Sequence, residues 1–384
     1  MKKKILYVTG SRAEYGIMKR LLLALRDDTN IELSIVATGM HCDKKYGLTY
    51  KNIENDGLFV NKLIDININN STNADVITAM SLCQKEFGLY FQDNKYDAVM
   101  ILGDRYEIFS VAVAAAMHNL PIIHLHGGEK TLGNYDEFIR HAITKMARLH
   151  LASTEEYRKR IIQMGEHPES VINIGALGAE NALTMNLPSK AELEDKFGSL
   201  SDPYFVVVFH PETLNLVSPG YQVAQLLNAL QIFSERYKYI FIGSNSDTGS
   251  EEIMTKITSF CHSTNSRIFT SVKPEEYLAL NKYSRGLIGN SSSGLIEIPS
   301  LDIPTINVGD RQKGRVRGNS VIDCLCETNA IAQAINTSQD SEFLEVIKKS
   351  ENPYYKNDVL KAALTVIKKF LEDKKVGYKD FYDL

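Results

Sequence analysis

The feature that most constrains the fold is a repeated pairing of a short apolar run with a longer amphipathic stretch. The runs are rich in β-branched residues, and the stretches between them carry apolar residues at helical spacing. This alternation is typical of βα units that assemble into a parallel sheet covered by helices. In the first half of the chain the predicted strands are Ile5–Thr9, Glu32–Thr38, Ala98–Leu102, Pro121–His126, Leu149–Ser153 and Val171–Ile174.

A polar stretch at Leu187–Asp202 interrupts the pattern, which then resumes. The second series of predicted strands is Tyr204–Phe209, Tyr239–Gly243, Arg267–Ser271, Gly286–Ile288 and Thr305–Val308. Because 384 residues exceed the roughly 250–300 that one hydrophobic core supports, we expect two doubly wound, Rossmann-like α/β domains. We place them at 1–187 and 188–360, and expect a helix and tail at 361–384 to cross back toward the first domain.

Composition narrows the possible partners. A formal net charge of -4 gives no general attraction for nucleic acid, so an acidic ligand must be held locally. The apolar run Ile5–Val8 is too brief for a signal peptide, and no run approaches the roughly 20 apolar residues of a membrane span. We therefore expect a cytoplasmic protein with no membrane partner, and its five scattered cysteines as free thiols.

Ligands of open α/β sheets bind where the parallel strands end, so the segments after the predicted strands are the place to look for function. The segment Gly289–Glu297 contains three successive serines at a predicted helix start. Ser291 and Ser292 could hold a diphosphate there, and Glu297 could accept hydrogen bonds from a ribose. The alternative is a plain N-cap beside a surface carboxylate.

Other residues after predicted strands could also bind an anion. Arg12 lies in the glycine-bounded turn Gly10–Gly16, and His210 follows the first strand of the second domain. A solvated arginine on an ordinary turn and a structural histidine are the alternatives. Asn245 and Arg311 follow later strands, and Arg311 opens a basic run at the same end of the second domain.

The first domain contributes groups that could move protons. Asp104 follows one predicted strand, His126 and Glu129 follow the next, and Asp136 comes soon after. Carboxylates and imidazoles at strand ends suit proton transfer beside a departing phosphate. A buried Asp–Arg pair is the alternative for Asp104, and a helix N-terminal carboxylate for Asp136. No metal is predicted, because the histidines lack the ligand spacing of a zinc site.

Taken together, these motifs resemble the hydrolysing UDP-N-acetylglucosamine 2-epimerases, in particular the bacterial sialic-acid capsule branch. The resemblance spans nearly the whole chain, in order, through the segments 10–16, 103–107, 126–129, 136–141, 289–297 and 309–315. It implies the GT-B architecture, in which two Rossmann-like domains enclose the active site in the cleft between them. It also implies a homodimer that needs no cofactor.

The resemblance further implies a substrate, UDP-N-acetylglucosamine, and a reaction. UDP leaves sugar C1 as the C2 proton is removed, and water adds to the resulting 2-acetamidoglucal to release N-acetylmannosamine for sialic acid synthesis. Position by position, Ser291 and Ser292 would hold phosphate, Glu297 the ribose, and His210 and Arg12 the diphosphate. Arg105, Asn245 and Arg311 would also line the site, and His41 would lie near the sugar.

The catalytic carboxylates implied by the resemblance are Asp104 and Asp136. Many family members have a glutamate ahead of a glycine pair where this chain has His126, and Glu129 follows the glycines. We expect His126, or else Glu129, to take over that proton transfer. The alternatives are a non-hydrolysing 2-epimerase, a hydrolase of a 2,4-diacetamido sugar nucleotide, a GT-B glycosyltransferase and a nucleotide-sugar sensor that only binds.

Overall fold

The computed structural model describes residues 2–243, 247–373 and 378–383. The chain forms two compact units. The first unit comprises Met1–Glu129, Asp136–Leu177 and Lys356–Leu384, and the second comprises Lys130–Tyr135 and Gly178–Tyr355. Residues 178–187, which were expected in the first domain, cluster with the second unit.

The first unit is built on a seven-stranded parallel sheet, as far as its described residues show, in the order β3-β2-β1-β4-β5-β6-β7. Its strands are β1 (Lys3–Thr9), β2 (Ile31–Thr38), β3 (Lys62–Ile64), β4 (Ala98–Leu102), β5 (Ile122–Leu125), β6 (Leu149–Ala152) and β7 (Val171–Asn173). Its helices are α1 (Arg12–Asp27), α2 (Tyr50–Asn55), α3 (Asn73–Asp93), α4 (Tyr106–Met117), α5 (Asp136–Met146), α6 (Glu155–Gln163) and α15 (Val359–Glu372), with short 3-10 turns η1 (Gly39–Cys42), η2 (Lys44–Tyr46) and η3 (Pro168–Ser170).

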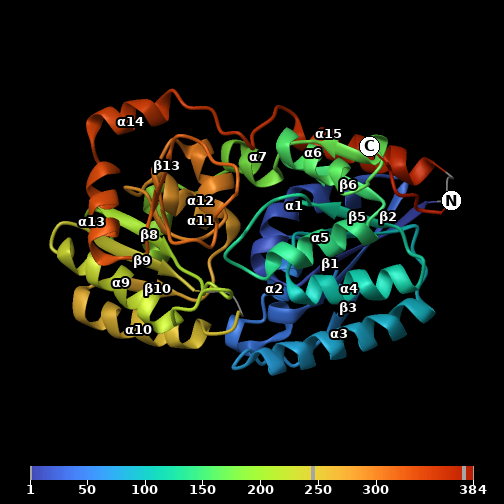
Figure 1. The fold of residues 1–384 in the computed structure, drawn as a ribbon, viewed down its shortest axis with the longest axis horizontal. Helices are drawn as coiled ribbons and strands as arrows, with labels where there is room; N and C mark the ends of the chain where they lie inside the picture. The colour runs from blue at the N-terminus through green and yellow to red at the C-terminus, as the bar shows by residue number, and fades with distance from the viewer. Residues whose placement is uncertain (1, 244–246, 374–377, 384) are drawn as a thin grey trace. The chain divides into compact units, whose positions relative to one another are not determined.

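Helices cover both faces of this sheet (Figure 1), which explains why β4 and the inner part of β1 are apolar throughout. All five residues of β4 are buried, and Ile5 to Val8 of β1 are fully enclosed. Helix α15 returns to this unit and packs beside α1 in the same core, through four buried residues one helical turn apart: Val359, Ala363, Ile367 and Leu371.

The second unit contains a parallel sheet that is six-stranded within the described ranges, in the order β10-β9-β8-β11-β12-β13. Its strands are β8 (Tyr204–Val208), β9 (Lys238–Ile242), β10 (Arg267–Phe269), β11 (Leu287–Gly289), β12 (Thr305–Val308) and β13 (Val321–Cys324). Its helices are α7 (Leu177–Thr184, starting at the boundary), α8 (Lys190–Phe197), α9 (Pro219–Ile232), α10 (Ser250–Thr264), α11 (Pro274–Lys282), α12 (Ser293–Ile296), α13 (Thr328–Thr337) and α14 (Ser341–Lys348), with the 3-10 turn η4 (Ile298–Leu301).

Alternate residues of β8 serve separate cores on the two faces of the second sheet. Phe205 and Val207 pack with α9, α10 and α13, whereas Val206 and Val208 pack with α8 and α11. The strand therefore needs apolar residues at every position, which is the run that the sequence shows.

The predicted strands are confirmed, with ends that differ by one or two residues. Two strands were missed, β3 and β13, and each forms an outer edge of its sheet. Edge strands are half-exposed and short, so Lys62 and Asp323 interrupt the apolar pattern that marks inner strands. Over residues 2–243, 247–373 and 378–383, no helix combines the length and apolar character that a bilayer crossing requires.

Candidate functional site

Each sheet has one place where its strand order reverses. In the first unit it lies between β1 and β4, and in the second between β8 and β11. The chain leaves these strands in opposite directions, which opens a crevice at the strand ends where ligands of doubly wound sheets bind. The segments at these two crevices are 10–12 and 103–105 in the first unit, and 209–212 and 290–292 in the second.

The loop after β1 leads into α1, and Ser11 caps that helix by accepting a hydrogen bond from the backbone N–H of Glu14 at 3.4 Å. Arg12 is the first helical residue, so it lies at the crevice. His41 is fully buried in η1, and its two ring nitrogens contact the hydroxyls of Thr9 at 3.1 Å and Thr49 at 2.9 Å. Burial lowers the pKa of His41 to about 4, so its ring is neutral and supports the loop from within.

Two glutamates lie beneath this loop. Glu14 accepts a hydrogen bond from the backbone N–H of Gly10 at 2.8 Å, and Glu107 pairs with Nε of Arg105 at 2.5 Å. A Cβ atom at Gly10 would lie 2.4 Å from Glu107 Oε1, so glycine is needed there. Burial, together with the charge of Glu107, raises the pKa of Glu14 to about 8, and Glu14 therefore keeps its proton at neutral pH.

The loop after β4 places Asp104 against Arg140 of α5. Arg140 is fully buried, and its Nε and Nη2 both donate to Asp104 Oδ2, with the Nε bond at 2.7 Å. The Asp–Arg pair that the sequence offered as an alternative is thus present, yet the Asp104 side chain remains 19% exposed. Asp136 is half-buried one helical turn before Arg140, on the same face of α5.

His126 directly follows β5 and has a left-handed backbone conformation, with φ of 63°. Such a conformation is uncommon outside glycine and is found often at functional sites. Its Nδ1 lies 2.8 Å from Glu129 Oε1, which also accepts the Ser153 hydroxyl at 3.0 Å. The backbone carbonyl of Glu129 accepts from Arg140 Nη1 at 2.8 Å. Glu129 therefore orients the His126 ring, and Arg140 ties this turn to Asp104.

His124 lies in β5, two residues before His126, and supports a neighbouring turn. Its Nε2 contacts the Gly103 carbonyl at 2.8 Å, and burial lowers its pKa to about 3. It supports the Gly103 turn as a neutral donor. Among the residues that the structure describes, no group of three or more histidine, cysteine, aspartate or glutamate side chains could hold a metal ion.

In the second unit, His210 and Asn290 join the two loops at the crevice. The backbone N–H of His210 donates to Asn290 Oδ1 at 2.7 Å, and Asn290 Nδ2 donates to the backbone carbonyl of His210 at 2.8 Å. Gly289 precedes this pair with φ of 137°, and a Cβ there would lie 1.9 Å from the Val208 carbonyl. The two strand ends can therefore approach closely only because residue 289 has no side chain.

The serine segment differs from expectation in one respect. Ser291 and Ser292 are half-buried and lead into α12, which has four residues before the chain turns into η4. A helix this short adds little dipole, so backbone N–H groups and hydroxyls are what Ser291 and Ser292 offer an anion. Glu297 follows α12, and its side chain lies against Gly178, where a Cβ would be 2.9 Å from Glu297 Cγ.

Arg311 is held to the same crevice. Its Nη1 donates to the Asn290 carbonyl at 3.1 Å, and Gln312 Nε2 donates to that carbonyl at 2.8 Å. Glu212 Oε1 accepts the backbone N–H groups of Asp310 at 2.8 Å and Arg311 at 3.2 Å. The loops after β8, β11 and β12 thus form one polar network. Asn245 lies outside the described residues.

Comparisons with known proteins identify the family of this chain. The family model described as UDP-N-acetylglucosamine 2-epimerase matches residues 23–368. The chain belongs to the UDP-N-acetylglucosamine 2-epimerase family. It is 59% identical over 382 residues to the polysialic acid biosynthesis protein P7 of Escherichia coli, covering 100% of this chain and 98% of that protein. It is 38% identical to the GDP/UDP-N,N'-diacetylbacillosamine 2-epimerase (hydrolyzing) of Campylobacter jejuni, over 89% of each chain.

The solved structures confirm the predicted fold class for this epimerase. Its structure matches the crystal structure of UDP-GlcNAc 2-epimerase from Neisseria meningitidis bound to UDP-GlcNAc, with a TM-score of 0.78 at 18% sequence identity. That match covers 95% of this chain and 100% of the other. The two parallel sheets with helices on both faces are therefore the GT-B fold of the epimerases.

The epimerase site contains three residues to which the sequence assigned no role: Glu14, Glu107 and Arg140. Glu107 had a usable signal, because it is the one charged residue in the otherwise apolar segment Tyr106–Met117. A charge in such a helix is buried with a partner. Glu14 and Arg140 carried no such signal, since both lie in segments where charged residues are common.

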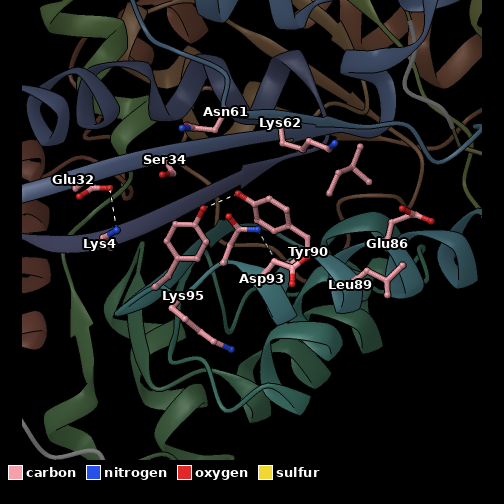
Figure 2. A pocket seen from close by; sticks show the side chains of 13 residues that line it. Lys4, Glu32, Ser34, Asn61, Lys62, Glu86, Leu89, Tyr90, Asp93 and Lys95 are labelled. Atoms are coloured by element: carbon pink, nitrogen blue, oxygen red, sulfur yellow. Dashed lines mark hydrogen bonds and ion pairs between the residues drawn. The ribbon is translucent and has the colours of Figure 1, made fainter.

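A cavity of about 720 Å³ lies elsewhere in the first unit of the epimerase. Figure 2 shows Lys4, Glu32 and Tyr90 among its lining residues, at the starts of β1 and β2 and near the end of α3. Lys4 is paired with Glu32 at 3.4 Å, and the Tyr90 and Tyr96 hydroxyls bond to each other at 2.6 Å. These groups are already paired with one another and lie at the opposite strand ends from the crevice, so this cavity is separate from the candidate site.

Proposed function

We propose that this epimerase hydrolyses UDP-N-acetylglucosamine to N-acetylmannosamine and UDP, as the first step of sialic acid synthesis in the cytoplasm. The names of two relatives support this proposal: one is a polysialic acid biosynthesis protein, and another is a hydrolysing 2-epimerase. The observation that carries the proposal is the His126–Glu129 pair, buried at a strained strand end and tied through Arg140 to Asp104.

The second unit would hold the nucleotide. Backbone N–H groups and hydroxyls at Ser291 and Ser292, with the guanidinium of Arg311, suit a diphosphate, and Glu297 suits the ribose hydroxyls. His210 lies in the same network through Asn290. Stabilising the negative charge of the departing UDP lowers the barrier to breaking the C1–O bond.

The first unit would act on the sugar, and Arg12 and Arg105 at its crevice supply positive charge that suits an anionic substrate. In the first step a base removes the C2 proton, the electron pair forms the C1–C2 double bond, and UDP leaves with the C1–O electrons. In the second step water adds its oxygen to C1 and gives a proton to a basic side chain, while an acid gives a proton to C2 from the opposite face. The products are N-acetylmannosamine and UDP.

These two steps need two proton-transfer groups, and we assign them to His126 and Asp104, with Asp136 one helical turn before Arg140, which binds Asp104. Glu129 holds Nδ1 of His126 and leaves Nε2 for proton transfer, because Nε2 bonds to no other described residue. Asp104 presents its exposed edge while Arg140 holds Oδ2. His41 fits a supporting role under this arrangement, since both of its ring nitrogens are engaged.

The test is to incubate the protein with UDP-N-acetylglucosamine in deuterated water and follow the products by proton NMR. We expect free N-acetylmannosamine carrying deuterium at C2, together with UDP. Accumulation of UDP-N-acetylmannosamine would refute hydrolysis, and unchanged substrate would refute the assigned sugar. A parallel incubation with a UDP-2,4-diacetamido sugar examines the substrate class named for the Campylobacter relative.

Variants examine the assigned residues in the same assay. His126→Asn and Glu129→Gln should each lower turnover by about 100-fold or more, as expected for removal of a general acid or base or of the group that orients it. His262→Asn is the matched control, because His262 is exposed on α10 of the second unit. Equal turnover in His126→Asn and the control would refute the assignment.

A further inference from the structure

The chain changes unit twice between the two groups of candidate catalytic residues. Glu129 and Asp136 both belong to the first unit, but the six residues between them, Lys130–Tyr135, belong to the second. We call this segment the bridging loop. It joins the His126–Glu129 turn to the first residue of α5, so the loop is covalently linked to both groups of candidate catalytic residues.

The bridging loop is anchored to the loop after β8. Asn134 is fully buried, and its Oδ1 accepts both the backbone N–H of Thr213, at 3.0 Å, and the Thr213 hydroxyl. The Thr213 hydroxyl in turn accepts the backbone N–H of Tyr135 at 3.1 Å. Thr213 follows His210 by three residues, so this anchor is directly connected to the nucleotide crevice.

A second anchor joins the bridging loop to the loop after β12. The Leu132 N–H donates to the Lys313 carbonyl at 3.1 Å. Gly133 lies so close to Asp310 that a Cβ would be 2.6 Å from the Asp310 carbonyl oxygen. Asp310 and Arg311 are held by Glu212, as described above. The bridging loop therefore shares one bonded network with Arg311, which the proposed function assigns to the diphosphate.

Both ends of the bridging loop are directly joined to structured residues of the first unit. Helix α5 begins at Asp136, immediately after the loop, and the carbonyl of Glu129, immediately before the loop, accepts a hydrogen bond from Arg140. Six residues can reach at most about 20 Å when fully extended, and this loop is fixed at Leu132, Gly133 and Asn134. The chain itself therefore connects the β8 and β12 loops to Glu129 and Asp136.

We propose that the bridging loop aligns the proton-transfer groups of the first unit in response to a diphosphate bound by the second, with Asn134 and Thr213 as positioning residues. The proposal rests on the proposed function for the identity of those groups. It requires no contact beyond the chain connection and the bonds within each unit. Because displacement of reacting groups by about 1 Å can reduce turnover by about 100-fold, loosening this anchor should act on kcat rather than on nucleotide affinity.

The test compares Thr213→Val, which removes the hydroxyl at nearly the same shape, with Thr213→Ser, which retains it. Thr255→Val is the matched control, since the Thr255 hydroxyl bonds only to its own helix at 2.9 Å. We expect Thr213→Val to lower kcat about tenfold or more and Thr213→Ser and Thr255→Val to stay within about twofold of the unmodified protein. The Kd for UDP, measured by calorimetry, should change by less than about threefold in all of them.

Asn134→Ala should repeat the effect, and it replaces Thr213→Val if that variant does not fold. A kcat unchanged in both folded variants would overturn the proposal. So would a loss of kcat matched by an equal loss of UDP affinity, because the residues would then act on nucleotide binding itself.

A second measurement separates this proposal from the proposed function. Hydrogen–deuterium exchange is followed with and without UDP in the unmodified protein and in Thr213→Val. We expect UDP to slow exchange in residues 126–141 of the unmodified protein and to leave that segment unaffected in the variant. This outcome supports the linkage even if another sugar is the substrate, and identical protection in both proteins would refute it.

Discussion

Replacement of Glu14 by glutamine offers a quantitative test of the buried acid pair at the first crevice. Burial and the charge of Glu107 raise the pKa of Glu14 from 4.5 to about 8 in the folded protein. Between these two values the folded state keeps a proton that the unfolded chain releases, so the free energy of unfolding falls as pH rises. Below pH 4.5 both states are protonated, and above pH 8 both are ionised.

The size of the effect follows from the pKa shift. One proton contributes at most about 1.4 kcal/mol per pH unit, so the unmodified protein should lose a few kcal/mol between pH 5 and 8. Glu14→Gln mimics the protonated acid and its bond to the Gly10 N–H, so the variant should lack this loss. We expect the variant to become the more stable protein at pH 8, by an amount that stops growing above about pH 9.

The assay is urea unfolding followed by circular dichroism at several pH values, because the chain contains no tryptophan for fluorescence. The difference between Glu14→Gln and the unmodified protein removes the contribution of all other titrating groups. Glu54→Gln, an exposed change in the same unit, is the control and should show a difference independent of pH. A flat difference for Glu14→Gln across pH 5–9 would mean that Glu14 is ionised in the folded protein, which would refute the reasoning.

Three further predictions concern other groups of the first unit. Arg140→Met leaves Asp104 without its buried partner, so it should lower the free energy of unfolding by about 3–5 kcal/mol in urea titrations; a change under about 1 kcal/mol would contradict this. His126→Val should be less stable than His126→Asn by about 1–2 kcal/mol, since a β-branched residue is strained at φ of 63°, and equal melting temperatures would exclude strain. Burial of Glu166 would raise its pKa, but its hydrogen bonds and ion pairs, including the one with Lys379, lower the pKa to about 2. These ion pairs therefore stabilise the fold above pH 4.5, and their contribution is lost as the pH falls toward 2. Glu166→Gln should therefore destabilise the protein by about 3 kcal/mol at pH 7 and by less at pH 4, and a constant difference would argue against this ion pair.

The inner strands and the order of the units could be predicted because their physical cause is local. A strand covered by helices on both faces favours apolar residues, and β4, which is apolar at every residue, was predicted with the bounds that the structure has. The bounds of β12 were also predicted, although its Thr305 and Asn307 are polar. The edge strands β3 and β13 lack that requirement, so their sequences show no comparable signal.

The candidate residues were predicted because ligand loops follow strands, which is a rule about chain order. The specific partner of each candidate residue and its protonation state could not be predicted from chain order. The pairing of Asp104 with Arg140 joins residues 36 positions apart, and the protonated state of Glu14 depends on the side chain of Glu107 behind Gly10. The length of α12 could not be predicted from the local sequence either, because a serine segment can precede a long helix or a short one.

The sequence by itself therefore determined the α/β class and the two series of βα units, and it predicted the segments of the candidate site, because each follows from periodicity and chain order. Tertiary structure alone decided which charges are buried together, that His126 is strained and oriented by Glu129, and that Lys130–Tyr135 belongs to the second unit. Burial and pairing arise from residues distant in the chain, and the ionisation of a group depends on all of its neighbours in space.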